Sequence, residues 1–336
     1  MAPLCLTSAS SQPKWSMPSY PLVHIFLLLI LISTACKAQL NYNFYGSSCP
    51  NLAGLVRATI TANLVRDPTV PAALLRLFFH DCQVQGCDGS ILLDSQGGID
   101  SERAAAANLG IRRLEFIDAI KASVERMCPN TVSCADLVVL AAREAVRITG
   151  GPFIEVPLGR RDGVTASSAR AEAELPSAET GFAGFLQVFQ SKGMTLEESV
   201  AILGAHTLGV GHCASVVNRL YPQRDRSIGP LFYSVLRLRC PARGAVQAGG
   251  GAVLPNDITA LAFDTQYFSN AVAGRGLFRV DAEVARNPLT APIVRFFNNN
   301  PAAFFQAFSS AFVKLSLSNV LTASQGEIRR NCRLVN

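Results

Sequence analysis

Histidine and tryptophan are scarce in this 336-residue chain, which has four histidines and a single tryptophan, Trp15. Three histidines, His80, His206 and His212, lie beyond residue 38, so few imidazoles are available to bind a metal or to move a proton. The sequence has no Asn-x-Ser/Thr sequon, and we therefore expect no N-linked glycans. It also has no P-loop, GxGxxG motif, internal repeat or coiled-coil pattern, which leaves no sequence signal for a nucleotide-binding or repeat protein.

Charged residues are also scarce, at 16% of the chain, and they are spread along it. Residues 1–38 contain two lysines and no acidic residue, so without this segment the 30 basic residues fall to 28 against 24 acidic ones, a net charge of +4. A mild, dispersed excess of this kind is not typical of a nucleic-acid-binding protein. No apolar run beyond residue 38 approaches the roughly 18 residues that a transmembrane helix needs, so we expect a soluble protein.

The N-terminal segment has the features of a secretory signal. Residues 22–32 form an apolar run of 11 residues that only His24 interrupts, and small residues follow. Such a run is too short to cross a bilayer but is typical of a signal-peptide core. A buried N-terminal helix is the alternative, although the abrupt polar change at Gln39 favours cleavage after Ala38. We expect a signal peptide at 1–38 and a secreted, extracellular chain at 39–336 that has no membrane association after cleavage.

Cysteine use supports an oxidising compartment. Ten cysteines fall to eight when Cys5 and Cys36 leave with the signal segment. An even number of cysteines in a secreted chain indicates disulfides, here four. Eight cysteines allow many different pairings, and their spacing alone does not select one.

Residues 74–90, LLRLFFHDCQVQGCDGS, are the most informative stretch. Apolar residues at helical spacing predict a helix up to Asp81, with Pro71 in its first turn. Arg76 and His80 are four residues apart and therefore share one face of that helix. An imidazole can move a proton while a neighbouring guanidinium stabilises developing negative charge, which suits acid–base work on a small polar molecule. An ordinary solvated helix face is the alternative.

A second pattern begins where this helical pattern ends. Asp81, Asp88 and Ser90, with Gly86 and Gly89 between them, place oxygen-bearing side chains in a tight loop, as a calcium ion requires. Two cysteines bracket the loop and could join to staple it. A turn without a metal is the alternative interpretation.

The remainder of the chain is predicted to be mostly α-helical, because strand-like alternation is rare and helical spacing recurs. Thr195 and Glu198 form a capping-box pattern that opens a helix leading to His206. A lone histidine on an apolar helix is more often a core residue than a ligand, so composition alone does not assign it a role. Helical patterns also cover the ranges 52–64, 114–127, 134–148 and 182–190.

The stretch from Arg76 to Ser90 resembles the distal motif of the secretory plant haem peroxidases (class III), R-x-x-F-H-D-C-x-V-x-G-C-D-x-S, at every fixed position. Residues 205–209, AHTLG, resemble the proximal motif of the same family, whose histidine ligates the haem iron. The resemblance covers the whole mature chain. It implies a mostly α plant haem-peroxidase fold, in which two helical lobes enclose one haem b. It further implies a monomeric enzyme that reduces hydrogen peroxide to water while oxidising small phenolic donors in one-electron steps.

The resemblance also implies roles for residues on the distal side of the haem. His80 would act on the peroxide first as general base and then as general acid, and Arg76 would stabilise the separating charge. Asn108 would accept a hydrogen bond from the other ring nitrogen of His80. Glu102 would in turn hold Asn108.

Further roles are implied for the proximal side and for the haem edge. His206 would bind the iron, and Asp281 would accept the N–H of His206. Pro176 would offer its carbonyl to phenolic donors at the haem edge. The first arginine of the GRRD string, Arg160, would pair with a buried carboxylate, Asp136.

Two calcium ions and a set of disulfides complete what the resemblance implies. The distal calcium ligands would be the side chains of Asp81, Asp88 and Ser90. The main-chain carbonyls of Val84 and Gly86 would complete the site. The proximal ligands would be Thr207, Asn256, Thr259, the carbonyl of Ala262, and Asp264. Asn256 stands where the family has Asp, which predicts a weaker proximal site unless the adjacent Asp257 compensates. The implied disulfides are Cys49–Cys128, Cys82–Cys87, Cys134–Cys332 and Cys213–Cys240.

Three further positions depart from the family pattern. Gln83 stands where the family usually has Phe, Phe78 stands where it often has His, and Ile154 stands where it usually has its single Trp. We expect these changes to affect haem-edge access or stability rather than the iron chemistry. A non-catalytic haem or cell-wall-binding protein is an alternative function, which the complete set of catalytic residues disfavours. An intracellular ascorbate-type peroxidase is disfavoured by the signal-like N-terminus, the eight cysteines and the calcium loop.

Overall fold

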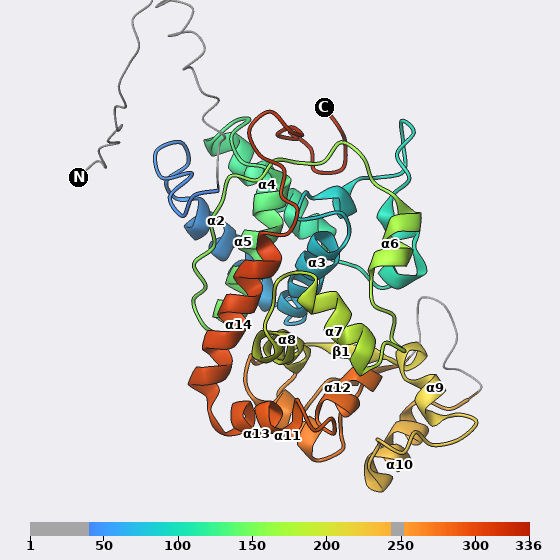
Figure 1. Cartoon of the computed structure of the whole chain (residues 1–336). Coiled ribbons are helices and arrows are strands. Elements are labelled where there is room, and N and C mark those ends of the chain that lie inside the picture. Colours follow the sequence, from blue (N-terminus) through green and yellow to red (C-terminus); the bar gives the residue numbers. More distant parts are fainter. Residues whose placement is uncertain (1–39, 243–251) are drawn as a thin grey trace, which may run out of the picture. The chain divides into compact units, whose positions relative to one another are not determined.

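The architecture is mostly α-helical, as the sequence predicts (Figure 1). The computed structural model describes residues 40–242 and 252–336, so the signal peptide expected at 1–38 lies outside the described part. The helices are α2 Leu52–Leu64, α3 Val70–Gln83, α4 Leu114–Met127, α5 Cys134–Ile148, α6 Ser168–Glu174, α7 Phe182–Gln190, α8 Leu196–Leu203, α9 Val217–Leu220, α10 Pro230–Arg239, α11 Gln266–Val272, α12 Arg279–Val284, α13 Ala291–Asn299 and α14 Pro301–Ser316. Short 3-10 turns are η1 Ser90–Leu92, η2 Glu102–Ala104, η3 Ala106–Asn108, η4 Gly204–Thr207 and η5 Cys213–Ser215. Strands β1 Val210–His212 and β2 Val253–Pro255 pair antiparallel, with Val210 opposite Pro255.

The helix boundaries follow local sequence signals. α5 begins where the Ser133 hydroxyl accepts a hydrogen bond of 3.1 Å from the N–H of Asp136, and it ends shortly before a glycine pair. α8 opens with the predicted capping box, in which Thr195 and Glu198 exchange hydrogen bonds of 2.7 and 3.2 Å. The helices predicted at 52–64, 114–127, 134–148 and 182–190 are confirmed with these bounds, as α2, α4, α5 and α7.

The helices form two packed groups that contact each other through α3 and α14. In the first group, α2, α3 and α4 pack on α5, and in the second group α8 packs on α14 while α13 packs on α11. Figure 1 shows α14 rising from beside α13 towards the first group, and α14 contacts α3. At that contact the rings of Phe78 and Phe312 stack with their centroids 4.3 Å apart. A cavity lies between α3 and the segment formed by α8 and η4.

The part of the chain that the structure describes contains four disulfides, which pair as the resemblance implies; three join residues at least 27 positions apart, and Cys82–Cys87 closes a short loop. They are Cys49–Cys128, Cys82–Cys87, Cys134–Cys332 and Cys213–Cys240. The expected ion pair is also present, with Arg160 Nη1 2.8 Å from Asp136 Oδ1 and both side chains fully buried. The disulfides restrict the conformations of the unfolded chain, which stabilises the folded state.

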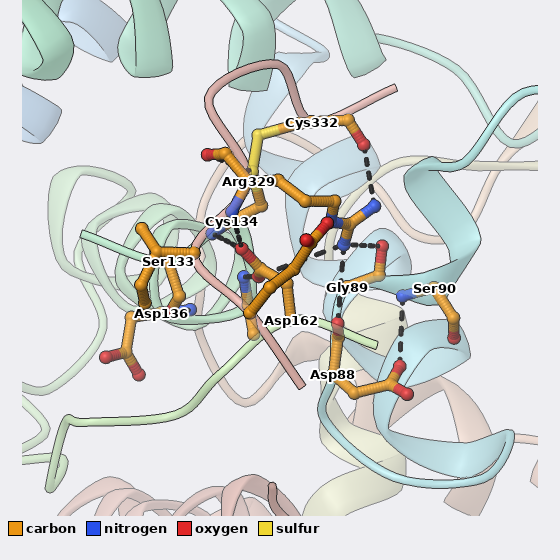
Figure 2. A network of polar contacts seen from close by, with 12 residues as sticks. Asp88, Gly89, Ser90, Ser133, Cys134, Asp136, Asp162, Arg329 and Cys332 are labelled. Atoms are coloured by element: carbon orange, nitrogen blue, oxygen red, sulfur yellow. Dashed lines mark hydrogen bonds and ion pairs between the residues drawn. A yellow bond between two sulfur atoms is a disulfide. The ribbon is translucent and has the colours of Figure 1, made fainter. Parts of the chain in front are cut away.

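One of these disulfides lies in a buried polar network (Figure 2). The Asp162 carboxylate accepts hydrogen bonds from the main-chain N–H groups of Cys134, over 3.1 Å, and of Arg329, over 2.9 Å. The Arg329 guanidinium donates to the carbonyl of Cys332 over 2.8 Å and to the carbonyl of Gly89 over 2.6 Å. The network therefore attaches the C-terminal segment both to the start of α5 and to the loop that follows α3.

Candidate active site

The α3 side of the cavity, here called distal, carries the predicted acid–base pair. Arg76 Nε donates to His80 Nε2 over 3.1 Å, and the other ring nitrogen of His80, Nδ1, donates to Asn108 Oδ1 over 2.6 Å. A neutral imidazole with its proton on Nδ1 satisfies both hydrogen bonds. Burial, reinforced by the charge of Arg76, lowers the pKa of His80 to about 3, so this neutral form persists at pH 7.

Asn108 is held by the main chain of Glu102 rather than by its carboxylate. Asn108 Nδ2 donates to the Glu102 carbonyl over 2.8 Å, because the two residues lie on successive 3-10 turns, η2 and η3. The Glu102 side chain is buried, and within the described chain neither of its carboxylate oxygens has a hydrogen-bond partner. Burial raises the pKa of Glu102 to about 8, so the isolated carboxyl is neutral at pH 7.

The opposite side of the cavity, here called proximal, is built around His206 on η4. His206 Nδ1 donates to Asp281 Oδ1 on α12 over 2.9 Å. Asp281 is buried and accepts two more hydrogen bonds, from the Tyr267 hydroxyl over 3.2 Å and from the Phe278 main-chain N–H over 3.0 Å. These contacts orient the ring and leave Nε2 free to bind a metal. Sequence reasoning missed Tyr267, which lies on α11 outside any motif.

Both histidines line one cavity of about 340 Å³. Much of its wall is apolar or aromatic, and this wall includes Phe79, Phe185, Val188, Phe189, Leu208 and Phe278. An apolar slot with an imidazole at each side fits a haem, whose iron takes a proximal histidine nitrogen and whose ring needs an apolar site.

One part of the cavity wall is rich in basic side chains, with Arg76, Arg112 and His212 all lining it. Gly110 lies among them with a φ of +82°, a left-handed conformation that favours glycine. A Cβ on Gly110 would lie 3.3 Å from Arg76 Nη1 and 3.5 Å from His212 Nε2, so the glycine keeps a small space open between them. The two negatively charged propionate groups of a haem would complement the positive charge of this region. His212 is thus part of the cavity wall.

The loop after α3 presents the oxygen-rich cluster that the sequence predicts. Asp81 Oδ2 accepts a hydrogen bond from the Gly89 N–H over 3.1 Å, and Asp88 Oδ1 accepts one from the Ser90 N–H over 3.0 Å. Asp81 Oδ1 and Ser90 Oγ are buried and have no hydrogen-bond partner in the described chain. Burial, followed by the charge of Asp88, raises the pKa of Asp81 well above its usual value, as expected of buried carboxylates without a counter-ion.

Main-chain oxygens would have to complete a calcium site in this loop. Among residues 40–242 and 252–336, no three His, Cys, Asp or Glu side chains form a group suited to a metal. The carbonyls of Val84 and Gly86 each accept one main-chain hydrogen bond, of 2.7 and 2.9 Å, which leaves each a second lone pair. Calcium binds such mixed sets of carboxylate and carbonyl oxygens, so the donors present fit this ion.

In the second predicted calcium cluster, the structure brings the adjacent Asp257 to Thr207. Thr207 Oγ1 lies 2.8 Å from Asp257 Oδ2 and 3.0 Å from Asp264 Oδ1, and its single proton can serve only one of them. Asn256 instead lines the cavity and donates from Nδ2 to the Leu208 carbonyl over 2.8 Å. The side chain of Asp257, and not that of Asn256, contacts Thr207, while Asn256 Oδ1 is buried and has no hydrogen-bond partner among the described residues.

The reason for this arrangement lies in the backbone that follows β2. The Asn256 N–H donates to the Gly209 carbonyl over 3.0 Å, which extends the pairing of β2 with β1 by one residue. Successive side chains of an extended chain point to opposite sides, so the next residue turns away from the cavity. Asp257 Oδ1 then accepts hydrogen bonds from the N–H and the hydroxyl of Thr259, over 2.8 and 3.1 Å. The cluster contains two carboxylates, which removes the reason to expect a weaker site.

The predicted donor edge also meets the cavity. Pro176 lines it together with Ser177 and Ala178, in the segment that follows α6, and both of the latter are exposed. Arg76, His80, His206 and Pro176 thus come from three segments of the chain to one cavity.

Comparison with known proteins agrees with this geometry. The family model described as Peroxidase matches residues 56–300. The chain belongs to the peroxidase family. It is 47% identical over 334 residues to Peroxidase 29 of Arabidopsis thaliana, an alignment that covers 96% of this chain and 98% of that protein. It is 40% identical to Peroxidase 28 of the same plant, with 93% and 98% covered, and 39% identical to Peroxidase 70 of Zea mays, with 95% and 99% covered.

These similarities confirm the resemblance to the class III plant peroxidases and the prediction of a peroxidase enzyme. No finding favours a non-catalytic protein that retains the peroxidase fold. The distances described above then indicate how this peroxidase is built to work.

Proposed function

We propose that this peroxidase binds one haem b, reduces hydrogen peroxide to water and oxidises small phenolic donors at the edge lined by Pro176. The observation that carries the proposal is the pair of histidines, His80 and His206, that face one apolar cavity with each Nδ1 bonded to its own acceptor. His206 Nε2 would hold the iron, and the space between Arg76 and His212 would take the propionates. When bound, the haem supplies the redox chemistry.

The distal residues are arranged to move a proton within the bound peroxide. His80 Nε2 carries the lone pair of the neutral ring, so it takes the proton from one peroxide oxygen and delivers it to the oxygen that departs as water. Arg76 keeps its charge at physiological pH and stabilises the negative charge that develops as the O–O bond separates. Asn108 holds the other ring proton in place, which keeps the basic nitrogen directed at the cavity.

The proximal residues set how strongly the ligand donates to the iron. A carboxylate that accepts the Nδ1 proton gives His206 partial imidazolate character, which favours the oxidised iron. The hydroxyl of Tyr267 donates to the same oxygen of Asp281 and so moderates this effect.

We further infer two calcium ions per chain and secretion of a monomer. The two oxygen-rich clusters support the calcium ions in different ways. In the distal cluster, Asp81 Oδ1 and Ser90 Oγ are buried without a hydrogen-bond partner in the described chain. In the proximal cluster, the single proton of the Thr207 hydroxyl faces the carboxylates of both Asp257 and Asp264. The signal-like residues 1–38 and four disulfides support an extracellular location, such as the cell wall. Among the described helices, none has the length and apolar character needed to span a bilayer.

Absorption spectra and a guaiacol assay test the proposal. The purified mature protein should bind haem, and its oxidation of guaiacol should require hydrogen peroxide. His80→Leu should keep the ferric haem spectrum and lose most of the turnover, which separates loss of chemistry from loss of folding. A wild-type protein that binds haem but oxidises no donor would favour the non-catalytic alternative.

A further inference from the structure

The side chain of Gln83 connects α3 to the end of α6, two segments that lead to the cavity. The proposed peroxidase mechanism gives this residue no role. It is the last residue of α3, the helix that carries Arg76 and His80. Its side chain is buried, with 7% of the residue exposed, and Nε2 donates to the main-chain carbonyl of Glu174 over 2.9 Å. Glu174 ends α6, two residues before Pro176 at the cavity edge.

A second hydrogen bond joins the same two segments. The Gln85 main-chain N–H donates to Glu174 Oε2 over 2.9 Å. Leu175 follows and is buried in a small apolar cluster with Val84. The main chain and the carboxylate of Glu174 are therefore held separately by the end of α3, so the chain reaches Pro176 from a fixed point. Beyond Pro176, residues 177–179 are exposed. The far end of this segment is held by Asn218, which donates to Glu179 Oε1 over 3.1 Å, and by Glu283 Oε2, which accepts from the Phe182 N–H over 2.8 Å. The contact with Gln83 and Gln85 is therefore the anchor on the α6 side of Pro176.

The amide of Gln83 is a poor choice for stability alone. Its Oε1 is buried and has no hydrogen-bond partner among the described residues. An unpaired buried acceptor destabilises a folded protein, and an apolar side chain of similar length would avoid that effect. What the amide does supply is the directional bond from Nε2 to α6. This contrast indicates that the residue positions the cavity edge rather than strengthening the core.

We propose that Gln83 and Glu174 form a clamp that sets the distance between the distal helix and the donor edge, and so determines which phenolic donors reach the cavity. Gln83 is a positioning residue, because it acts on donors through Pro176 and does not touch them. The inference rests on the proposed role of Pro176. Bulky donors cover more of the edge than small ones, so they should be more sensitive to a loosened clamp.

Gln83→Met tests the clamp in the haem-loaded enzyme, because Met keeps the length of the side chain but cannot donate to Glu174. We expect the KM for a bulky phenol, syringaldazine, to change by about 3- to 10-fold, as for loss of one hydrogen bond, and the KM for guaiacol to change less. Peroxide reduction, followed at the Soret band by stopped flow, should be unchanged. Glu174→Ala, which removes the bond from Gln85, should act in the same direction. Gln306→Met, at an exposed position of α14, makes the same chemical change and should alter none of these quantities.

Two more measurements separate positioning from a general loss of structure. In Gln83→Met, hydrogen exchange at the main-chain amides of Leu175 and residues 177–180 should be faster, whereas Tm should hold or rise because the unpaired Oε1 is gone. Unchanged donor KM and unchanged exchange in an otherwise active enzyme would overturn the clamp. A lower Tm with equal losses for both donors would also overturn it, by indicating a purely structural role. If the wild-type protein reduced no peroxide, the proposed function would fail, and hydrogen exchange alone would decide on the clamp.

Discussion

At the scale of single residues, two histidines with similar bonding are prepared for different tasks. Each ring donates from Nδ1 and directs Nε2 to the cavity, but His80 donates to a neutral amide and His206 to a carboxylate. The amide of Asn108 fixes a tautomer without adding negative charge, which suits a base that must accept and return a proton. The charge of Asp281 makes its partner a stronger metal ligand.

Replacing His80 by Leu should slow peroxide reduction by about 10²–10⁴-fold, the contribution typical of general acid–base catalysis. Leu cannot accept a proton, whereas the iron ligand His206 and its support are untouched, so haem binding should persist. Stopped-flow spectra at the Soret band measure the rate, and the ferric spectrum of the variant is the control. A rate within a few-fold of the wild-type value would remove His80 from the mechanism.

The pH dependence of peroxide reduction should reflect the low pKa of His80. The ring is the active base only when neutral, and its pKa is about 3, so the rate should be level from pH 7 to about 4 and fall below about 3. Arg76→Gln removes a positive charge that helps to lower this pKa, so its acidic limb should move to higher pH. Rapid pH-jump mixing limits acid damage during the measurement. An acidic limb near 6.5 in the wild-type enzyme would contradict the buried, neutral assignment.

At the scale of elements, the two calcium clusters are supported differently. The distal loop is closed by the Cys82–Cys87 disulfide, and Arg329 holds its Gly89 carbonyl. The proximal cluster depends on the turn after β2 and on Thr207, which is adjacent to His206, the proposed iron ligand. A change in the proximal cluster should therefore reach the haem more directly than a change in the distal loop.

Asp257→Asn should weaken the proximal calcium by about tenfold or more, because calcium affinity depends on the number of charged ligands. The ferric spectrum should shift as this ion leaves, since Thr207 adjoins His206. Metal counting during graded chelation, with spectra recorded in parallel, measures both effects. Asn256→Asp is the matched control, and it should not change calcium retention because residue 256 faces the cavity. Tighter calcium binding in that control would restore the assignment made from sequence spacing.

At the scale of the whole molecule, the chain is closed by a link between residues far apart. Cys134 and Cys332 are separated by 198 positions, and the Asp162–Arg329 network surrounds their bond (Figure 2). The C-terminal segment thus reaches back to α5 and to the distal loop. The loss of this link should affect both global stability and calcium retention.

Replacing both Cys134 and Cys332 by Ala should lower the free energy of unfolding by about 5 kcal/mol. The reason is that a disulfide removes conformational entropy from the unfolded chain, and it removes more when it closes a longer loop. The comparison is Cys213–Cys240, which spans 27 positions and should contribute about 3.5 kcal/mol. Denaturant unfolding at fixed calcium and haem measures the difference. The first variant should also lose the distal calcium more readily. Equal destabilisation by the two pairs would show that loop length does not govern their contribution.

The sequence by itself determined the features that depend on short spacing. Arg76 and His80 share a helix face because they are four residues apart, and the capping box of α8 depends on two residues three apart. Helical periods and caps act within one or two turns, so they can be predicted without knowing what packs nearby. The disulfide pairing, in contrast, came from the resemblance to a family, because spacing alone does not select partners.

Only the tertiary structure decided which way several side chains point. Asp257 rather than Asn256 faces Thr207, because the N–H of Asn256 is bound to the Gly209 carbonyl beside β1 and its side chain lines the cavity. Tyr267 reaches Asp281, and Gln83 reaches Glu174, across contacts between elements that have no common period in the sequence. Such contacts depend on the packing of whole helices and loops, and a shift of one residue in an extended segment reverses the side to which each side chain points.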